Sequence, residues 1–251
     1  MILVIAGATF REATRSRSFV LLLTLYALGV LLSRVGGWIS GTDGGLITAN
    51  LVMSLQSVFG VLVAVATGTA LVHSEIQQKT LYTVLSRPVA RWRFVVGKFT
   101  GLALALVCGQ AAMLALGVLY LWATGGAVSG WLAVAGALTA MEVLVMAAVS
   151  LCWAAVSSPL LATVLCLATY ALGHAVGSLP GLMYHLKGFQ RPLCVAFASL
   201  VPDLSRFAYR DQAVHAIPID MGDAGMRLVY GLCWICLLVT ITVAVVRRKQ
   251  L

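Results

Sequence analysis

Six long apolar segments alternate with shorter polar segments along this chain. Each apolar segment is close to the ~20 residues that a helix needs to cross the hydrocarbon core of a bilayer. The pattern therefore predicts an all-α polytopic membrane protein with six transmembrane helices. The predicted spans are residues 19–38, 49–73, 93–122, 131–156, 160–179 and 226–246.

Residues 1–18 have an amphipathic pattern instead. Arg11, Glu12 and Arg15 mark one face of a predicted helix, and the opposite face is apolar. We expect an N-terminal elbow helix that lies along the bilayer surface before the first span. The charged residues follow ten mostly apolar ones, an order that does not favour a cleavable signal peptide. The residues of the apolar face are Ile2, Ile5, Ala6, Phe10 and Ala13.

Small residues recur at a spacing of four within several predicted spans. Gly60, Ala64 and Gly68 form such a row in the second span, and Gly97 and Gly101 begin the third. This spacing permits a neighbouring helix to approach closely. Gly173 and Gly177 in the fifth span are interpreted in the same way, as a pair for helix packing.

Composition supports a membrane protein with one domain, residues 1–251. The chain is 61% hydrophobic and 10% charged, with a mean hydropathy of +1.00. A soluble domain carries roughly 25% charged residues. The net charge is +9, but the basic residues lie in loops at span ends rather than on one face, so nucleic-acid binding is not expected.

The distribution of basic residues predicts the orientation. Most of them lie in the N-terminal segment, in the loop around residues 74–93 and at the C-terminus. The positive-inside rule then places both termini and this loop in the cytoplasm. Residues 180–225 become an extracytoplasmic loop. Its apolar stretch, residues 192–201, is too short to span, so we expect a short re-entrant or interfacial helix there, with a polar helix or turn beginning at 201–207.

The stretch from Ser74 to Gly101 is the most informative part of the chain. Ser74 and Gln77 match a capping box and predict that a new helix begins at Ser74. Pro88 disfavours helical geometry at the preceding residue and can open the next helix. The pattern predicts a short helix at the membrane surface, a basic elbow and then a span. Leu81, Val84 and Leu85 share one face of that helix.

The same stretch resembles the cytoplasmic loop of ABC type-2 transporter permeases. The resemblance rests on Glu75, the Thr80–Leu81 pair, and residues 85–89, 91–93 and 97–99. Lys79 departs from the family pattern, since members often carry Gly before the Thr-Leu pair. The resemblance implies that residues 74–93 contain a coupling helix that contacts a separate ATPase subunit. The implied contact residues are Glu75, Gln78, Lys79, Leu81, Leu85, Arg87, Arg91 and Arg93.

The resemblance also implies a function. It describes the membrane subunit of an ATP-binding cassette transporter, an exporter in a bacterial or archaeal inner membrane, which pairs with a second permease copy and contacts membrane lipid. ATP and Mg²⁺ are expected on the partner ATPase. The chain has no Gly-x-x-x-x-Gly-Lys-Ser/Thr motif, so we expect no nucleotide, cofactor or catalytic site of its own.

Two alternative functions come from residues inside the spans. Glu142 is the only acid within a predicted span. One interpretation is a proton relay or a substrate site, and the other is a structural hydrogen bond or a protonated side chain that faces a neighbouring helix. We expect no intramembrane base beside it, which disfavours a gradient-driven secondary transporter. Ser129 and His174 weakly resemble the dyad of intramembrane rhomboid proteases, but Ser129 is expected in a turn.

No metal or redox site is expected. Cys233 and Cys236 have CxxC spacing but lie within a span, where a thiol acts as a small apolar group. The soft ligands of the outer loop fit no spacing for a metal site. They are Met183, His185, Cys194 and His215.

Overall fold

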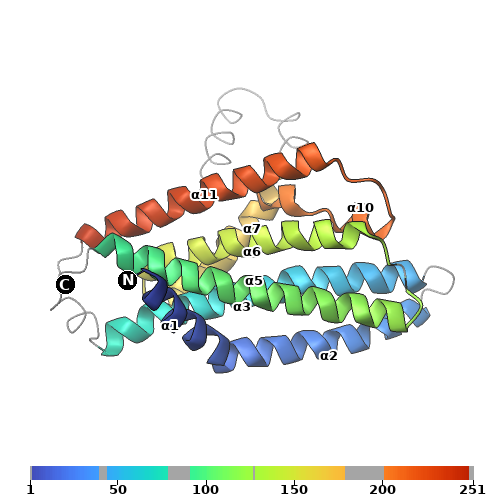
Figure 1. Ribbon diagram of the computed structural model, residues 1–251, viewed down its shortest axis with the longest axis horizontal. Helices are drawn as coiled ribbons and strands as arrows, with labels where there is room; N and C mark the ends of the chain where they lie inside the picture. Colours follow the sequence, from blue (N-terminus) through green and yellow to red (C-terminus); the bar gives the residue numbers. More distant parts are fainter. Residues whose placement is uncertain (1, 40–43, 79–90, 127, 179–200, 249–251) are drawn as a thin grey trace.

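The computed structural model describes residues 2–39, 44–78, 91–126, 128–178 and 201–248, and it is helical without strands over these ranges (Figure 1). Six of its helices are long and apolar enough to cross a membrane, so the prediction of an all-α protein with six spans is confirmed. The elements are α1 (Ile2–Arg15), α2 (Arg17–Ile39), α3 (Gly44–Gln78), α5 (Arg91–Ala123), α6 (Trp131–Val156), α7 (Pro159–Val176), η2 (Leu204–Phe207), α10 (Arg210–Val214) and α11 (Met221–Arg248).

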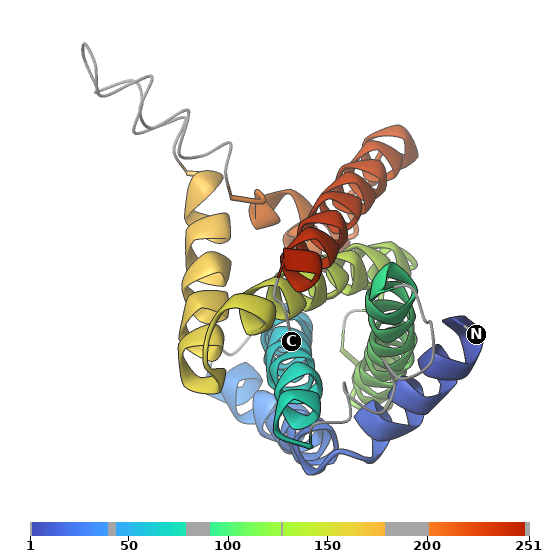
Figure 2. The same cartoon turned by 90° about the vertical axis from the view of Figure 1, so that its left-hand side faces the viewer.

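Helix α6 forms the centre of the bundle. Most of its side chains are buried, because α3, α5, α7 and α11 all pack against it. Such a helix is apolar around its whole circumference. Helices α7 and α11 lie at the periphery, and most of their surface faces outward (Figure 2).

The two ends of the bundle differ in the elements that they carry. The start of α1, the end of α3, the start of α5 and the end of α11 lie together at one end (Figure 1). The opposite end holds α10 and the junctions between α2 and α3 and between α5 and α6. Helix α3 contains 35 residues, or about 52 Å at 1.5 Å per residue. It is therefore longer than the ~30 Å hydrocarbon core that it crosses.

The predicted row of small residues in α3 is a site of close packing. A Cβ atom at Gly60 would overlap the amide of Gln110, and one at Gly68 would overlap the hydroxyl of Ser150. Ala64 lies between them, fully buried, and its carbonyl accepts a hydrogen bond from Ser150 at 3.4 Å. The row thus lets polar side chains of α5 and α6 reach the backbone of α3.

Helix α1 packs against α5 along its predicted apolar face. Its buried residues include Ala6 and Ala13. A Cβ atom at Gly101 of α5 would collide with the carbonyl oxygen of Ala6, and one at Gly97 would meet the Ile5 side chain at 3.0 Å. The glycine pair at the start of α5 is therefore the surface on which α1 lies.

The predicted helix start at Ser74 is wrong. Helix α3 runs through this position without a break and ends at Gln78. No Gly or Pro lies between Leu71 and Gln78, and extending an existing helix is less costly than nucleating a new one. The surface helix expected after Ser74 otherwise lies outside the described residues.

The segment before the last span is less polar than expected. Leu204 and Phe207 of η2 are almost completely buried, and so is Val214 of α10. Helix α11 begins at Met221, five residues before the predicted start. The apolar stretch at 192–201 falls almost entirely outside the described residues, as do Met183, His185 and Cys194.

Candidate functional site

Four of the residues predicted to contact an ATPase lie at the end of α3 and the start of α5. Glu75 and Gln78 lie in the last turns of α3, and Arg91 begins α5. Arg93 is exposed, and its guanidinium carbon lies 5.4 Å from the centroid of the Trp92 ring. These positions share one end of the bundle (Figure 1). Four predicted contact residues, Lys79, Leu81, Leu85 and Arg87, lie outside the described residues.

An ion pair reinforces the contact between α1 and α5 near this end. Lys98 Nζ lies 3.6 Å from Glu12 Oε2, and the lysine side chain is mostly buried while the glutamate is half exposed. The lysine ammonium also lies 5.9 Å from the centroid of the Phe94 ring. With the glycine contacts described above, this pair fixes α1 to the first turns of α5, so the two helices should move as one unit.

Glu142 is buried in the centre of the bundle and contacts two other helices. The Ser57 hydroxyl of α3 donates a hydrogen bond to Glu142 Oε2 at 3.2 Å. His174 of α7 places Nε2 3.4 Å from Glu142 Oε1. The expectation that no base lies beside this acid is therefore wrong.

The turn between α6 and α7 explains the missed contact. Glu142 and His174 stand equally far before and after Ser158 in the sequence. In an antiparallel hairpin of two helices, equal distances from the turn bring residues to the same level, since both helices rise 1.5 Å per residue. This symmetry was the sequence signal that could have identified the pair.

The Glu142–His174 contact leaves two buried atoms without an aligned hydrogen bond. They are Glu142 Oε1 and His174 Nδ1. The Tyr170 ring packs on the imidazole with a centroid distance of 4.6 Å. Two deprotonated acceptors at 3.4 Å repel each other, whereas one proton makes either a hydrogen bond or an ion pair. The geometry therefore suits a pair that holds one proton.

Polar contacts continue from this cluster toward α10. Arg210 Nη1 donates to Ser54 Oγ at 2.8 Å, one turn along α3 from Ser57. Asn50 Nδ2 donates to Asp211 Oδ1 at 3.2 Å. Arg210 thus brings a positive charge within electrostatic range of Glu142. The short helix α10 is fastened to α3 by these two hydrogen bonds.

The segment containing η2 packs on α7 and α11. Gly173 and Gly177 are covered by Leu204 and Ser205 of η2, so they accommodate this segment rather than a neighbouring span. The Tyr230 hydroxyl accepts a hydrogen bond from the amide of Asp203 at 2.9 Å. This packing places η2 against the last turns of α7, while the His174 side chain stays 38% exposed.

A second polar cluster joins the start of α11 to the residue preceding α10. The Tyr209 hydroxyl donates to Asp223, whose carboxylate also lies 2.9 Å from Arg227 Nη2. Burial and this hydrogen bond raise the pKa of Tyr209 to about 12. The phenol therefore remains protonated and able to donate at neutral pH.

The protease dyad is not assembled. Ser129 accepts a hydrogen bond from the amide of Trp131 at 3.1 Å, at the very start of α6. His174 lies beside Glu142, which is about 16 Å further along α6 at 1.5 Å per residue. Within the described residues, no group of three or more His, Cys, Asp or Glu side chains could hold a metal ion.

A comparison with known families identifies the family of the chain. A family model described as "ABC-2 family transporter protein" matches residues 3–180. The match spans α1 to α7 and ends before η2, α10 and α11. No curated protein matches the chain significantly.

Proposed function

Because the chain belongs to the ABC-2 family of transporter proteins, we propose that this membrane-spanning subunit of an ABC transporter is an exporter driven by a separate ATPase subunit. ATP and Mg²⁺ bind to that partner. The family match over more than two thirds of the chain is the observation that carries the proposal. The same match lends no support to a secondary transporter or an intramembrane protease.

The contact with the ATPase is assigned to the segment between α3 and α5. Glu75, Gln78, Lys79, Leu81, Leu85, Arg87, Arg91 and Arg93 are the proposed contact residues. The support is that the end of α3 and the start of α5, which flank this segment, lie at the same end of the bundle (Figure 1). Since α5 carries α1 through the Gly101 contact, ATPase motion would move α1 as well.

The proposed setting is the inner membrane of a bacterium or archaeon, with both termini in the cytoplasm. The support is the excess of basic residues at the end of the bundle that holds both termini. A second permease copy completes the transporter. The peripheral helices α7 and α11 leave apolar surface available for that copy and for lipid.

Co-purification tests this function directly. We expect a tagged chain, extracted in mild detergent, to retain an ATPase at a fixed ratio. Leu81→Asp and Arg87→Glu should each release the ATPase, because they alter the proposed contact. Arg34→Ala, an exposed arginine near the opposite end of α2, is the matched control and should retain it. A chain that purifies alone and is indifferent to added ATPase would refute the proposal.

A further inference from the structure

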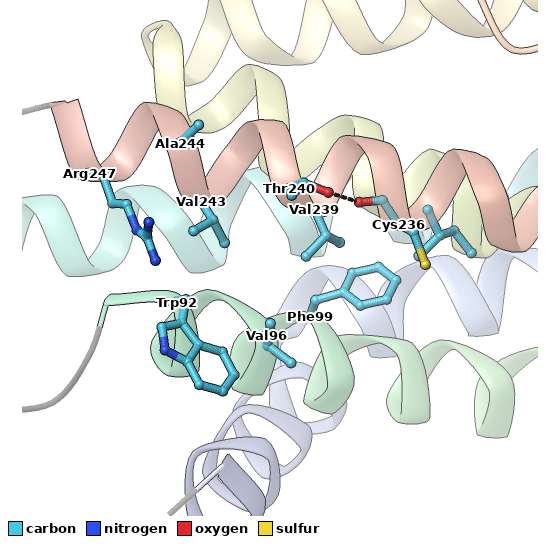
Figure 3. A pocket seen from close by; sticks show the side chains of 10 residues that line it. Trp92, Val96, Phe99, Cys236, Val239, Thr240, Val243, Ala244 and Arg247 are labelled. Atoms are coloured by element: carbon cyan, nitrogen blue, oxygen red, sulfur yellow. Dashed lines mark hydrogen bonds between the residues drawn. The ribbon is translucent and has the colours of Figure 1, made fainter.

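An apolar groove separates the first turns of α5 from the second half of α11. Its volume is about 730 Å³. Trp92, Val96 and Phe99 of α5 line it, and Figure 3 shows the Phe99 ring extending toward α11. The residues of α11 that line the groove are Ile235, Cys236, Val239, Thr240, Val243, Ala244 and Arg247.

Helix α11 packs on α6 along much of its length, as far as Thr242, which is buried and hydrogen-bonds with Cys152, and the groove lies on the side of α11 next to α5. Gly231 lies against Met141 of α6, and the neighbouring Ile235 is buried. Between Ile235 and Arg247, the α11 residues that line the groove have small or β-branched side chains, which leave space beside α5. Those side chains are partly or fully exposed, so the groove opens along its length toward the surroundings of the helix bundle.

The length of the groove matches one leaflet of a bilayer. Ile235 and Arg247 are twelve residues apart on α11, or about 18 Å at 1.5 Å per residue. Half of the ~30 Å hydrocarbon core is about 15 Å. A groove that begins at the membrane surface would therefore end near the bilayer centre.

The open end of the groove is aromatic and positively charged. Arg247 and Trp92 both line this end, and the Arg247 side chain extends from α11 toward α5 (Figure 3). Arg93 adds a second guanidinium, 5.4 Å from the Trp92 ring centroid. Tryptophan and arginine at this depth are typical of the boundary between hydrocarbon and headgroups. The groove thus combines an apolar interior with a cationic end.

We propose that this groove is a binding site for an anionic glycerophospholipid, with an acyl chain between α5 and α11 and the phosphate at Arg247 and Arg93. Charge complementarity selects this occupant. A second copy of the chain, packed symmetrically on the same surface, would instead bring its own Arg93 and Arg247 to the same place, where like charges repel. The proposal is independent of any ATPase and goes beyond the transport function.

Native mass spectrometry of the purified chain tests the site. The protein is equilibrated in mixed micelles that contain phosphatidylcholine in excess over phosphatidylglycerol, and retained lipid is measured after washing. We expect wild-type protein to retain one phosphatidylglycerol per chain. Val243→Trp, which fills the groove, should abolish retention of both lipids. Arg247→Ala should keep the acyl-chain site but lower the preference for phosphatidylglycerol by about fivefold.

Matched variants control for folding and for unspecific charge effects. Leu237→Trp adds the same ring to α11 at an outward-facing position that is 49% exposed and outside the groove. Arg34→Ala removes an exposed arginine elsewhere. Both should retain lipid like the wild type. Because Arg247→Ala leaves the apolar lining intact, it tests the headgroup contact even if Val243→Trp fails to fold.

Two results would overturn the proposal. One is unchanged retention in Val243→Trp together with an unchanged headgroup preference in Arg247→Ala. The other is efficient disulfide crosslinking through Cys236, a groove residue, between two chains in native membranes. That crosslink would place a second copy in the groove instead of a lipid. Neither result depends on ATPase binding, so failure here and failure of the transport function are distinguishable.

Discussion

Glu142 shows how a single side chain can depend on its neighbours from other helices. Its carboxyl group is nearly inaccessible, yet it contacts Ser57 of α3 and His174 of α7. An unpaired charge at this depth would be costly. One proton shared with the imidazole removes that cost and links the peripheral α7 to the central α6. The pair is thus first a structural contact, whatever else it does.

A double-mutant cycle measures this contact. We expect Glu142→Leu and His174→Leu each to lower the unfolding temperature in detergent, because each removes one partner of the contact that joins α6 to α7. The double variant should lose less than the sum of the two. Polar contacts between membrane helices give coupling energies of about 0.6 kcal/mol on average, up to about 1.7.

Strictly additive losses would show that the 3.4 Å approach contributes nothing to stability. Glu142→Gln provides a further comparison, because its amide keeps a partner for Ser57 and carries no charge. It should be less destabilising than Glu142→Leu.

At the scale of elements, the packing of α1 on α5 is the contact most open to a simple test. The two helices approach so closely at Gly101 that the neighbouring atom is a backbone oxygen, that of Ala6. A backbone atom cannot rotate away, so any side chain at Gly101 must displace α1. Gly7, on α1 itself, has open space around its Cβ position.

The two glycines should therefore respond in opposite ways to alanine. Gly101→Ala should destabilise the protein by about 1–3 kcal/mol, the usual cost of overpacking. Gly7→Ala should stabilise it by about 0.5–1 kcal/mol through helix propensity. Thermal unfolding of both variants, compared with wild type in the same detergent, gives the answer. Equal effects would mean that α1 does not pack on α5 as described.

The contact between Tyr209 and α11 makes a prediction about pH. The pKa of Tyr209 is raised to about 12 in the folded protein, above the ~10 of an unfolded chain. The protonated phenol is therefore favoured by folding. Its stabilisation is complete below pH ~10 and is lost as pH rises toward about 12.

Unfolding measured across this alkaline range checks the pH prediction. Tyr209→Phe should lower stability at neutral pH and flatten the decline above pH ~10, because it cannot donate to Asp223. Tyr120→Phe is a control, since its hydroxyl is exposed and donates to a backbone carbonyl at 3.3 Å. If the loss of stability above pH ~10 were the same in Tyr209→Phe as in the wild type, other groups would cause that loss.

The two ends of the bundle differ. One end is formed by the termini of the long helices α3, α5 and α11, and the other carries the short helix α10. Helices α3 and α5 are each longer than the hydrocarbon core of a bilayer, and the groove opens at the first end. At the other end, α10 is fastened to α3 by side-chain hydrogen bonds. This asymmetry fits a protein that receives energy on one side of a membrane.

The proposed orientation is tested by labelling single cysteines in a cysteine-free variant. Val128→Cys, at an exposed position in the turn before α6, should react with a membrane-impermeant maleimide added outside cells. Gln250→Cys, near the C-terminus, should react only after the membrane is opened. The reverse pattern would invert the topology, and equal reaction at both sites would argue against a uniform orientation.

The spans were predictable because a bilayer sets a minimum apolar length, and α6 was predicted with its bounds unchanged. The small-residue rows of α3 and α5 were predictable because four-residue spacing aligns small residues on one helix face, whereas Gly173 and Gly177 of α7 pack against η2 instead of a span. The predicted helix start at Ser74 was wrong because the capping box is a local signal, and α3 continues through this position. The Glu142–His174 pair was missed because it depends on the register of a hairpin, which no local pattern specifies.

The uninterrupted helix α3 connects the Glu142 site to the proposed ATPase contact, so binding at the two sites can be thermodynamically linked. Ser57, which binds Glu142, and Gln78, at the proposed ATPase contact, are 21 residues apart on one helix, or about 32 Å at 1.5 Å per residue. If ATPase binding moves Ser57 relative to Glu142, it changes the proton affinity of the Glu142–His174 pair. Linkage then requires that proton binding change ATPase affinity by the same factor. Protonation of the Glu142–His174 pair would then change the affinity for the ATPase, and ATPase binding would change the protonation of the pair.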